Sequence, residues 1–164
     1  MKKRTQSPIH PADAAKGAAA EERFRAWLDR SGLPHLYVEQ SPFTVPAHLR
    51  GEIKRPDYLV GIPRVGMVAF DVKAKVLYRG RLVFDVAEVR KLRAFSRLFH
   101  LTVFFACLDP EGGPEGRWIR LDQLDDVPAV RLNGVLTLSL PADEAQAVSL
   151  RKDFYTAFVG AALS

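Results

Sequence analysis

The spacing of apolar positions changes along the chain, and each spacing predicts a different element. Residues 14–29 place apolar side chains three to four positions apart, which is typical of one buried face of a helix. Glu21 shares this face with Ala20, Phe24 and Leu28. A carboxylate within an apolar stripe is costly unless it is paired or bound to a metal ion, so Glu21 is a candidate functional residue.

Short stretches with strand character follow the helix. They cover residues 36–38, 55–62, 66–76 and 82–84. The segment Pro63-Arg64-Val65-Gly66 predicts a tight connection, so the second and third stretches are expected to form an antiparallel hairpin.

A second helix is predicted from Asp85 to about Leu98. Asp85 fits the N-cap, and Glu88, three residues later, fits its capping-box partner. The apolar run from 101 to 108 then predicts a buried strand. Strand, helix and strand in this order imply a parallel crossover.

Beyond residue 108 the pattern predicts a strand, an acidic turn, a hairpin and a final helix. Asn133-Gly134 is typical of a hairpin turn that pairs 129–132 with 135–140. The other elements are expected at 117–121, 122–126 and 142–163.

The composition suits one globular domain, and the charge is unevenly distributed. The chain has 164 residues, 48% of them hydrophobic, and a net charge of +5. Residues 1–105 hold 19 Lys and Arg against 10 Asp and Glu, whereas residues 106–164 hold 5 against 9. A basic first part favours a polyanionic partner. There is no apolar run long enough for a membrane span or a signal-peptide core, and the cytoplasm is the expected compartment.

Several classes of site are disfavoured by the residues present. The single cysteine, Cys107, lies in an apolar run and is expected to be a buried thiol, which excludes a disulfide within the chain and a thiolate zinc site. The four histidines show no ligand spacing. Fingerprints of phosphate loops and dinucleotide sites are missing from the sequence.

The two strands of the expected hairpin each carry an acid where an apolar residue is expected. Asp57 follows Pro56, and strand alternation places Asp71 on the same face as Lys73 and Lys75. The hairpin would bring Asp57 close to Asp71, with Glu21 approaching from the first helix.

This set of residues fits phosphodiester hydrolysis. Carboxylate oxygens of Asp57, Asp71 and Glu21 suit Mg²⁺, with Mn²⁺ as a substitute, because hard cations prefer oxygen ligands. A bound cation lowers the pKa of water and polarises the phosphoryl oxygen. Lys73 would stabilise the developing charge or orient the attacking water.

The pattern resembles the PD-(D/E)XK nuclease superfamily. The match consists of Glu21 on the first helix, Pro56-Asp57 on one strand and Asp71-Val72-Lys73 on the next, and the similarity covers residues 14–108. The resemblance implies an α/β fold with a restriction-endonuclease-like core, a mixed central sheet flanked by helices, and a C-terminal β-hairpin and helix. Glu22 is the alternative to Glu21.

The resemblance further implies a metal-dependent endonuclease that acts on DNA, as a homodimer or with other DNA-processing subunits. Residues 1–13 are interpreted as a flexible basic arm and 14–164 as one nuclease-like domain, with a catalytic core at 14–108 and a scaffold at 109–164. Candidate contacts to nucleic acid are Lys75, Arg79, Arg81 and Lys91. In the family a Gln or Lys one turn into the second helix often assists the metal site. Lys91 and Arg90 are available here, and that role stays open.

Two other interpretations are kept. The chain could be a nuclease-like subunit that binds DNA or an assembly without cleaving, although such a role would not require Asp57, Asp71 and Lys73. It could also be an unrelated basic interaction domain, which would make the whole set of matching residues accidental.

Overall fold

The computed structural model of the chain describes residues 10–162, and the structural statements below concern this range. Its centre is a six-stranded mixed sheet in the order β1-β2-β3-β5-β6-β9. Strands β3 and β5 run parallel, and every other neighbouring pair runs antiparallel. The strands are β1 (His35–Tyr37), β2 (Tyr58–Ile62), β3 (Gly66–Ala74), β5 (Thr102–Leu108), β6 (Glu115–Arg120) and β9 (Gln146–Ser149).

A smaller antiparallel sheet packs beside the first. It has the order β4-β8-β7, formed by β4 (Arg81–Asp85), β7 (Val130–Leu132) and β8 (Val135–Pro141). The predicted hairpin at Asn133-Gly134 is confirmed as β7–β8. The pairing of β4 with β8 was not predicted, because it joins residues far apart in the sequence.

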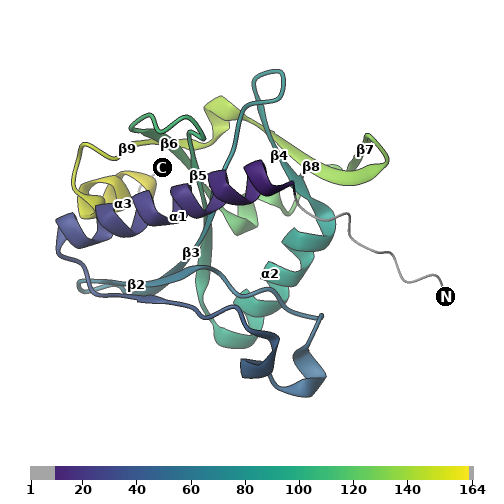
Figure 1. The fold of residues 1–164 in the computed structure, drawn as a ribbon, viewed down its shortest axis with the longest axis horizontal. Helices are drawn as coiled ribbons and strands as arrows, with labels where there is room; N and C mark the ends of the chain where they lie inside the picture. Colours follow the sequence, from purple (N-terminus) through teal and green to yellow (C-terminus); the bar gives the residue numbers. More distant parts are fainter. Residues whose placement is uncertain (1–9, 163–164) are drawn as a thin grey trace.

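Helices cover both faces of the large sheet (Figure 1). Helix α1 (Pro11–Ser31) and helix α3 (Phe154–Ala162) lie on one face, and α2 (Val86–Phe99) and the small sheet lie on the other. Four short 3-10 helices occupy connections, at Pro42–Thr44, Ala47–Leu49, Leu121–Leu124 and Ala142–Glu144. The predicted α/β class, with a mixed sheet flanked by helices, is confirmed.

Helix α1 is longer than the sequence pattern indicated. Its N-cap is His10, whose side chain accepts a hydrogen bond from the N–H of Ala12, and Pro11 occupies the first turn. Residues 11–13, predicted to belong to a flexible arm, are therefore helical. Residues 1–9 of that arm lie outside the described residues. The helix ends at Gly32, whose φ of 67° gives the left-handed cap expected there.

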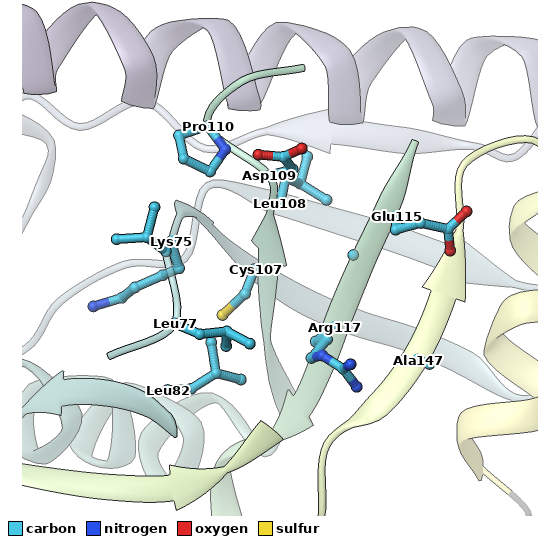
Figure 2. Close-up of a pocket in the computed structure, with 12 residues that line it drawn as sticks. Lys75, Leu77, Leu82, Cys107, Leu108, Asp109, Pro110, Glu115, Arg117 and Ala147 are labelled. Atoms are coloured by element: carbon cyan, nitrogen blue, oxygen red, sulfur yellow. The ribbon is translucent and has the colours of Figure 1, made fainter. Parts of the chain in front are cut away.

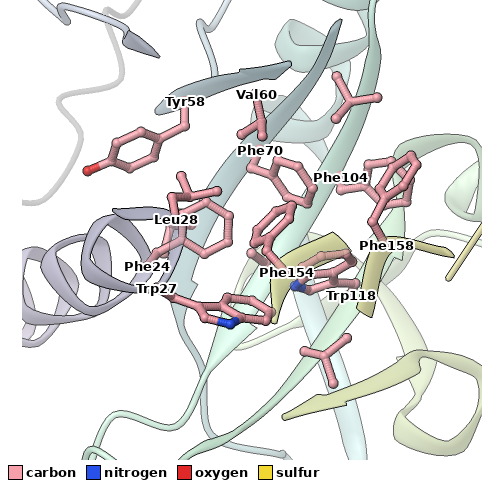
Figure 3. Packing of buried hydrophobic residues seen from close by; sticks show 14 of the residues in the cluster. Phe24, Trp27, Leu28, Tyr58, Val60, Phe70, Phe104, Trp118, Phe154 and Phe158 are labelled. Carbon is pink, nitrogen blue, oxygen red and sulfur yellow. The ribbon is translucent and has the colours of Figure 1, made fainter. Parts of the chain in front are cut away.

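Aromatic side chains fill the core between α1, α3 and the sheet (Figure 3). Phe70 of β3 lies with its ring centroid 5.3 Å from those of Phe24 and Phe154, and 4.9 Å from that of Trp118. Each fully buried side chain of this size contributes roughly 1.5–3 kcal/mol. The cluster therefore fixes α1, which carries Glu21, against the strand that carries Asp71.

The predicted helix at 142–163 is wrong in its first half. A 3-10 turn and strand β9 replace its first part, because Gln146–Ser149 pairs with β6 at the edge of the large sheet, with Val148 opposite Gly116. The helix begins at Phe154, after Asp153, whose carboxylate accepts from the N–H of Thr156. Phe154 and Phe158 are buried, as expected.

The predicted crossover is confirmed. Strand β3 connects through β4 and α2 to β5, which pairs with it in parallel from Val68 opposite Thr102 to Ala74 opposite Leu108. Because β2 pairs on its other side, β3 lies inside the sheet. Each of its residues is thus paired with at least one neighbouring strand.

Candidate active site

Asp57 and Asp71 meet where β2 begins. Tyr58, the first residue of β2, lies opposite Phe70, so Asp57 and Asp71 follow directly at the end of the β2–β3 pairing. The backbone N–H of Val72 donates a hydrogen bond of 2.7 Å to Asp57 Oδ2, and the N–H of Asp57 donates to the carbonyl of Phe70. The hairpin thus holds Asp57 against the Asp71-Val72-Lys73 segment, as its residue pattern predicted.

Alternation along β3 sends its functional side chains toward α2. Phe70 and Val72 belong to the core beneath α1, whereas Ala69 belongs to the core beneath α2. Asp71 and Lys73 share the second direction. Asp71 is completely buried, at 0% exposure, so its charge requires partners within the protein.

Two lysines and a second acid supply these partners. Lys54 Nζ lies 2.6 Å from Asp71 Oδ1, and Lys73 Nζ lies 2.8 Å from Asp71 Oδ2. Both ammonium groups also donate to Oε1 of Glu88. Two carboxylates and two ammonium groups therefore form a closed ring of charges, here called the charge ring (Lys54, Asp71, Lys73 and Glu88).

The role assigned to Glu88 from the sequence was wrong. Asp85 is the N-cap of α2, as predicted, and its Oδ1 accepts from the N–H groups of Ala87 and Glu88. The Glu88 side chain does not return to Asp85 but reaches Lys54 and Lys73. Two ammonium groups attract a carboxylate more strongly than one backbone N–H does.

Lys54 was not identified from the sequence. It lies in the loop before β2, where no periodicity indicates its direction, and its own N–H donates to the carbonyl of Lys91 on α2. One available signal was its position three residues before Asp57, on the same segment as the Pro-Asp pair.

The pKa values follow from burial and from these neighbours. Burial and the charge of Asp71 raise the pKa of Asp57 to about 7, against the lowering effect of the Val72 N–H. Burial also opposes ionisation of Glu88, but Lys73 and Lys54 lower its pKa to about 2. Burial opposes the charge of Lys73, but Asp71 and Glu88 raise the pKa of this lysine above its ordinary value.

Glu21 approaches from α1, on the other side of the sheet. It is half-buried, and the hydroxyl of Tyr58 donates to its backbone carbonyl at 3.4 Å. Burial, followed by the charge of Asp71, raises the pKa of Glu21. Glu22 is exposed and forms an ion pair of 2.6 Å with Arg25. Of these two glutamates, Glu21 is therefore the one that interacts electrostatically with Asp71.

The donor atoms fit a hard divalent cation. Asp71 Oδ2 is buried and accepts no hydrogen bond from the residues described, although Lys73 lies beside it. Asp57 and Asp71 repel one another, and a cation between them would relieve that repulsion. Within residues 10–162, no three or more His, Cys, Asp or Glu side chains are grouped so that they could hold a metal ion.

The four residues predicted to contact nucleic acid differ in how exposed their side chains are and in whether those side chains already have partners. Lys75 Nζ lies 5.0 Å from the ring centroid of Phe84 and donates to the carbonyl of Val83. Arg81 is exposed but binds Ser139. Lys91 is half-buried on α2. Arg79 is exposed in the turn before β4, over the ring of Tyr78.

A cavity of about 410 Å³ adjoins the end of β3 (Figure 2). Lys75, Leu82, Cys107 and Arg117 are among the residues that line it. None of the residues of the charge ring does, so this cavity is separate from the candidate site. Cys107 is buried, as predicted, and burial raises its pKa to about 12. Its thiol is therefore not a nucleophile.

Comparison with known proteins identifies the fold. No protein-family model and no curated protein matches the sequence. The structure is similar to that of Hjc, a Holliday junction resolvase from the archaeal hyperthermophile Archaeoglobus fulgidus, with a TM-score of 0.56 and 19% sequence identity over 88% of this chain and 99% of that one. The predicted α/β fold, with a mixed central sheet flanked by helices, is thereby shared with a solved nuclease structure. No helix within residues 10–162 has the length and apolar character to cross a membrane.

Proposed function

We propose that this chain is a metal-dependent endonuclease that hydrolyses phosphodiester bonds in DNA. The observation that carries the proposal is the meeting of Asp57 with Asp71 and Lys73 at the start of the β2–β3 hairpin. This meeting occurs in a fold similar to that of a Holliday junction resolvase. A similar fold alone would not assign an activity, because one fold supports many functions. The buried acids and the lysine supply the chemical reason.

Each residue has a role that its surroundings favour. Asp57 and Asp71 would hold Mg²⁺, or Mn²⁺ in its place, and Glu21 would assist directly or through a water molecule. When bound, the cation supplies a water of lowered pKa and neutralises charge on the phosphate. Lys73 is kept protonated by Asp71 and Glu88, so it offers a fixed positive charge to the developing anion.

The substrate is proposed to be DNA held by basic side chains near the site. Arg79 is exposed and free to contact a phosphate, and Lys75, Arg81 and Lys91 would contribute local positive potential. A homodimer, which would place two sites on one substrate, is the proposed assembly. Sedimentation of the protein with and without a four-way junction tests it.

A second candidate is a nuclease-like subunit that binds DNA without cleaving it. One observation favours it: both oxygens of Asp71 already have an ammonium neighbour. Buried acids and Lys73 argue for cleavage instead, because binding to phosphates does not require buried carboxylates.

The experiment is an incubation with supercoiled plasmid and with a labelled four-way junction, in Mg²⁺, in Mn²⁺ or in EDTA. Cleavage that requires the cation and is abolished in both Asp71→Ala and Lys73→Ala supports the proposal. The exposed Lys152→Met serves as a matched control that keeps activity. A wild-type protein that retards the junction but leaves it intact in both cations would establish the second candidate instead.

A further inference from the structure

One side chain of the charge ring comes from a loop instead of from a regular element. Lys54 precedes β2, and its ammonium group lies between two carboxylates from separate elements, Asp71 of β3 and Glu88 of α2. It thus occupies the position of a cation that bridges two acids. Within the described residues, no other loop residue contacts both of these carboxylates through its side chain.

The two lysines of the ring differ in how firmly they are held. Lys73 is two residues from Asp71 within β3, where both residues are paired with β5, so its attachment point cannot move away from the site. Lys54 is attached by one backbone hydrogen bond, of 3.2 Å, to the carbonyl of Lys91. Its side chain is 28% exposed and that of Lys73 is 21% exposed, so the two differ mainly in how their backbones are held. Of the two, Lys54 is therefore the lysine that can withdraw toward solvent.

A buried carboxylate needs a positive partner in every state of the protein. Without a divalent cation, Lys54 and Lys73 meet this requirement for Asp71. A divalent cation next to Asp71 would bring two further positive charges beside the two ammonium groups. Like charges at such short range repel strongly, so one of them must leave.

We propose that Lys54 is a positioning residue that acts as an internal counter-ion of Asp71 and competes with the divalent cation for this carboxylate. The inference rests on the proposed metal-dependent function, and it adds a regulation of cation affinity by the chain itself. Lys54 keeps Asp71 paired and oriented while the cation is absent, and cation binding displaces its ammonium group.

The inference gives Lys54 an effect opposite to that of an ordinary supporting residue. Removing a support would weaken cation binding, whereas removing a competitor strengthens it. Lys54→Met keeps the length and apolar stem of the side chain but not the charge. Lys54→Arg keeps the charge, and Lys152→Met removes one positive charge from an exposed position elsewhere.

The test is a calorimetric titration of each protein with Mn²⁺, without DNA. We expect Lys54→Met to bind Mn²⁺ about tenfold more tightly than the wild type, as follows from removing one unit charge at close range. Lys54→Arg should bind Mn²⁺ within about twofold of the wild type because it keeps the charge. Lys152→Met should also bind within about twofold, because the charge it removes is distant and screened. Unchanged or weaker binding by Lys54→Met overturns the inference.

Thermal unfolding with and without Mn²⁺ guards against a variant that is merely unstable. Lys54→Met should have a lower melting temperature than the wild type in EDTA and a larger increase on adding Mn²⁺, because a tighter ligand stabilises more. A smaller increase overturns the inference. If the wild type shows no detectable Mn²⁺ binding, the metal-dependent function is overturned together with the inference. The same holds if Asp71→Ala still binds Mn²⁺ as the wild type does. Wild-type binding that requires Asp71, with no gain in Lys54→Met, overturns the inference alone.

Discussion

The carboxylate of Asp57 accepts a hydrogen bond from the backbone N–H of Val72, the residue between Asp71 and Lys73. This bond ties the Pro-Asp segment to the Asp-Val-Lys segment through the backbone, so substitution of neighbouring side chains would leave it in place. It also holds two acids together at a cost, because burial and Asp71 raise the pKa of Asp57 to about 7.

The first prediction concerns stability against pH in the absence of metal. A carboxyl whose pKa is higher in the folded than in the unfolded protein binds extra protons when folded, so its contribution to stability is lost as pH rises. The free energy of unfolding should fall by roughly 2–4 kcal/mol between about pH 4 and pH 7. Urea unfolding in EDTA across this range measures it.

Asp57→Asn should reduce this dependence to the smaller part that the raised pKa of Glu21 contributes, and stabilise the metal-free protein above pH 7. The exposed Asp126→Asn is the control and should leave the pH profile unchanged. A wild-type profile that is flat from pH 4 to 7 would contradict the position assigned to Asp57.

The second prediction concerns Glu88. Glu88→Gln leaves two buried or half-buried ammonium groups with one carboxylate, and an uncompensated charge in such a place costs about 3 kcal/mol. Cleavage should fall as well, because Lys73 loses the partner that helps to hold it. In the wild type, the stability from Glu88 should be present above pH 4.5 and decline toward about pH 2, where its carboxylate takes up a proton.

Unfolding at pH 7 and cleavage of a four-way junction measure the two effects of Glu88→Gln. Glu144→Gln, a change of the same type at an exposed position, should alter neither. Stability equal to that of the wild type would show that the charge ring does not support the fold.

The third prediction separates Glu21 from Glu22. Glu21→Gln should lower the cleavage rate by about 10- to 100-fold, the effect typical of losing one group that supports a metal site. Glu22→Gln should leave the rate unchanged, since this side chain is exposed and pairs with Arg25. Rates at saturating Mg²⁺ measure both, and the reverse ranking would transfer the role to Glu22.

The fourth prediction compares two arginines in exposed turns with a positive φ. Arg79 lies in the turn after β3, and Arg64 lies in the turn before it, at opposite ends of the strand. Arg79→Ala should weaken DNA binding and reduce the salt dependence of log K by about one. Arg64→Ala should change neither. Equal effects of both substitutions would exclude a DNA contact specific to Arg79.

The sequence was sufficient to predict those site residues whose positions follow from the local pattern of strands and turns. Asp71 and Lys73 lie on β3 and Asp57 directly precedes β2, and the alternation and hairpin turn that place them together are local features. Lys54 and Glu88 were missed because their partners are tertiary. Glu88 has the spacing of a capping residue, and only the packing of α2 against β3 shows that two ammonium groups are within its reach.

The same limit explains the errors in the fold. The pattern identified β4 and the β7–β8 hairpin, yet nothing local indicates that Leu82 lies opposite Leu140. Residues 142–153 contain alanine and acidic residues that favour a helix in isolation. Pairing with β6 overrides that propensity, because an edge of the large sheet is available to Gln146–Ser149.

The interior place of β3 has a consequence for synthesis on the ribosome. Until residue 108 has emerged, the strand that carries Asp71 has a neighbour only at β2, and its other side is an open edge. Nascent or truncated chains that stop before β5 would therefore display unpaired backbone groups, which promote aggregation. Strand β3 is paired on both sides only after β5 has been synthesised.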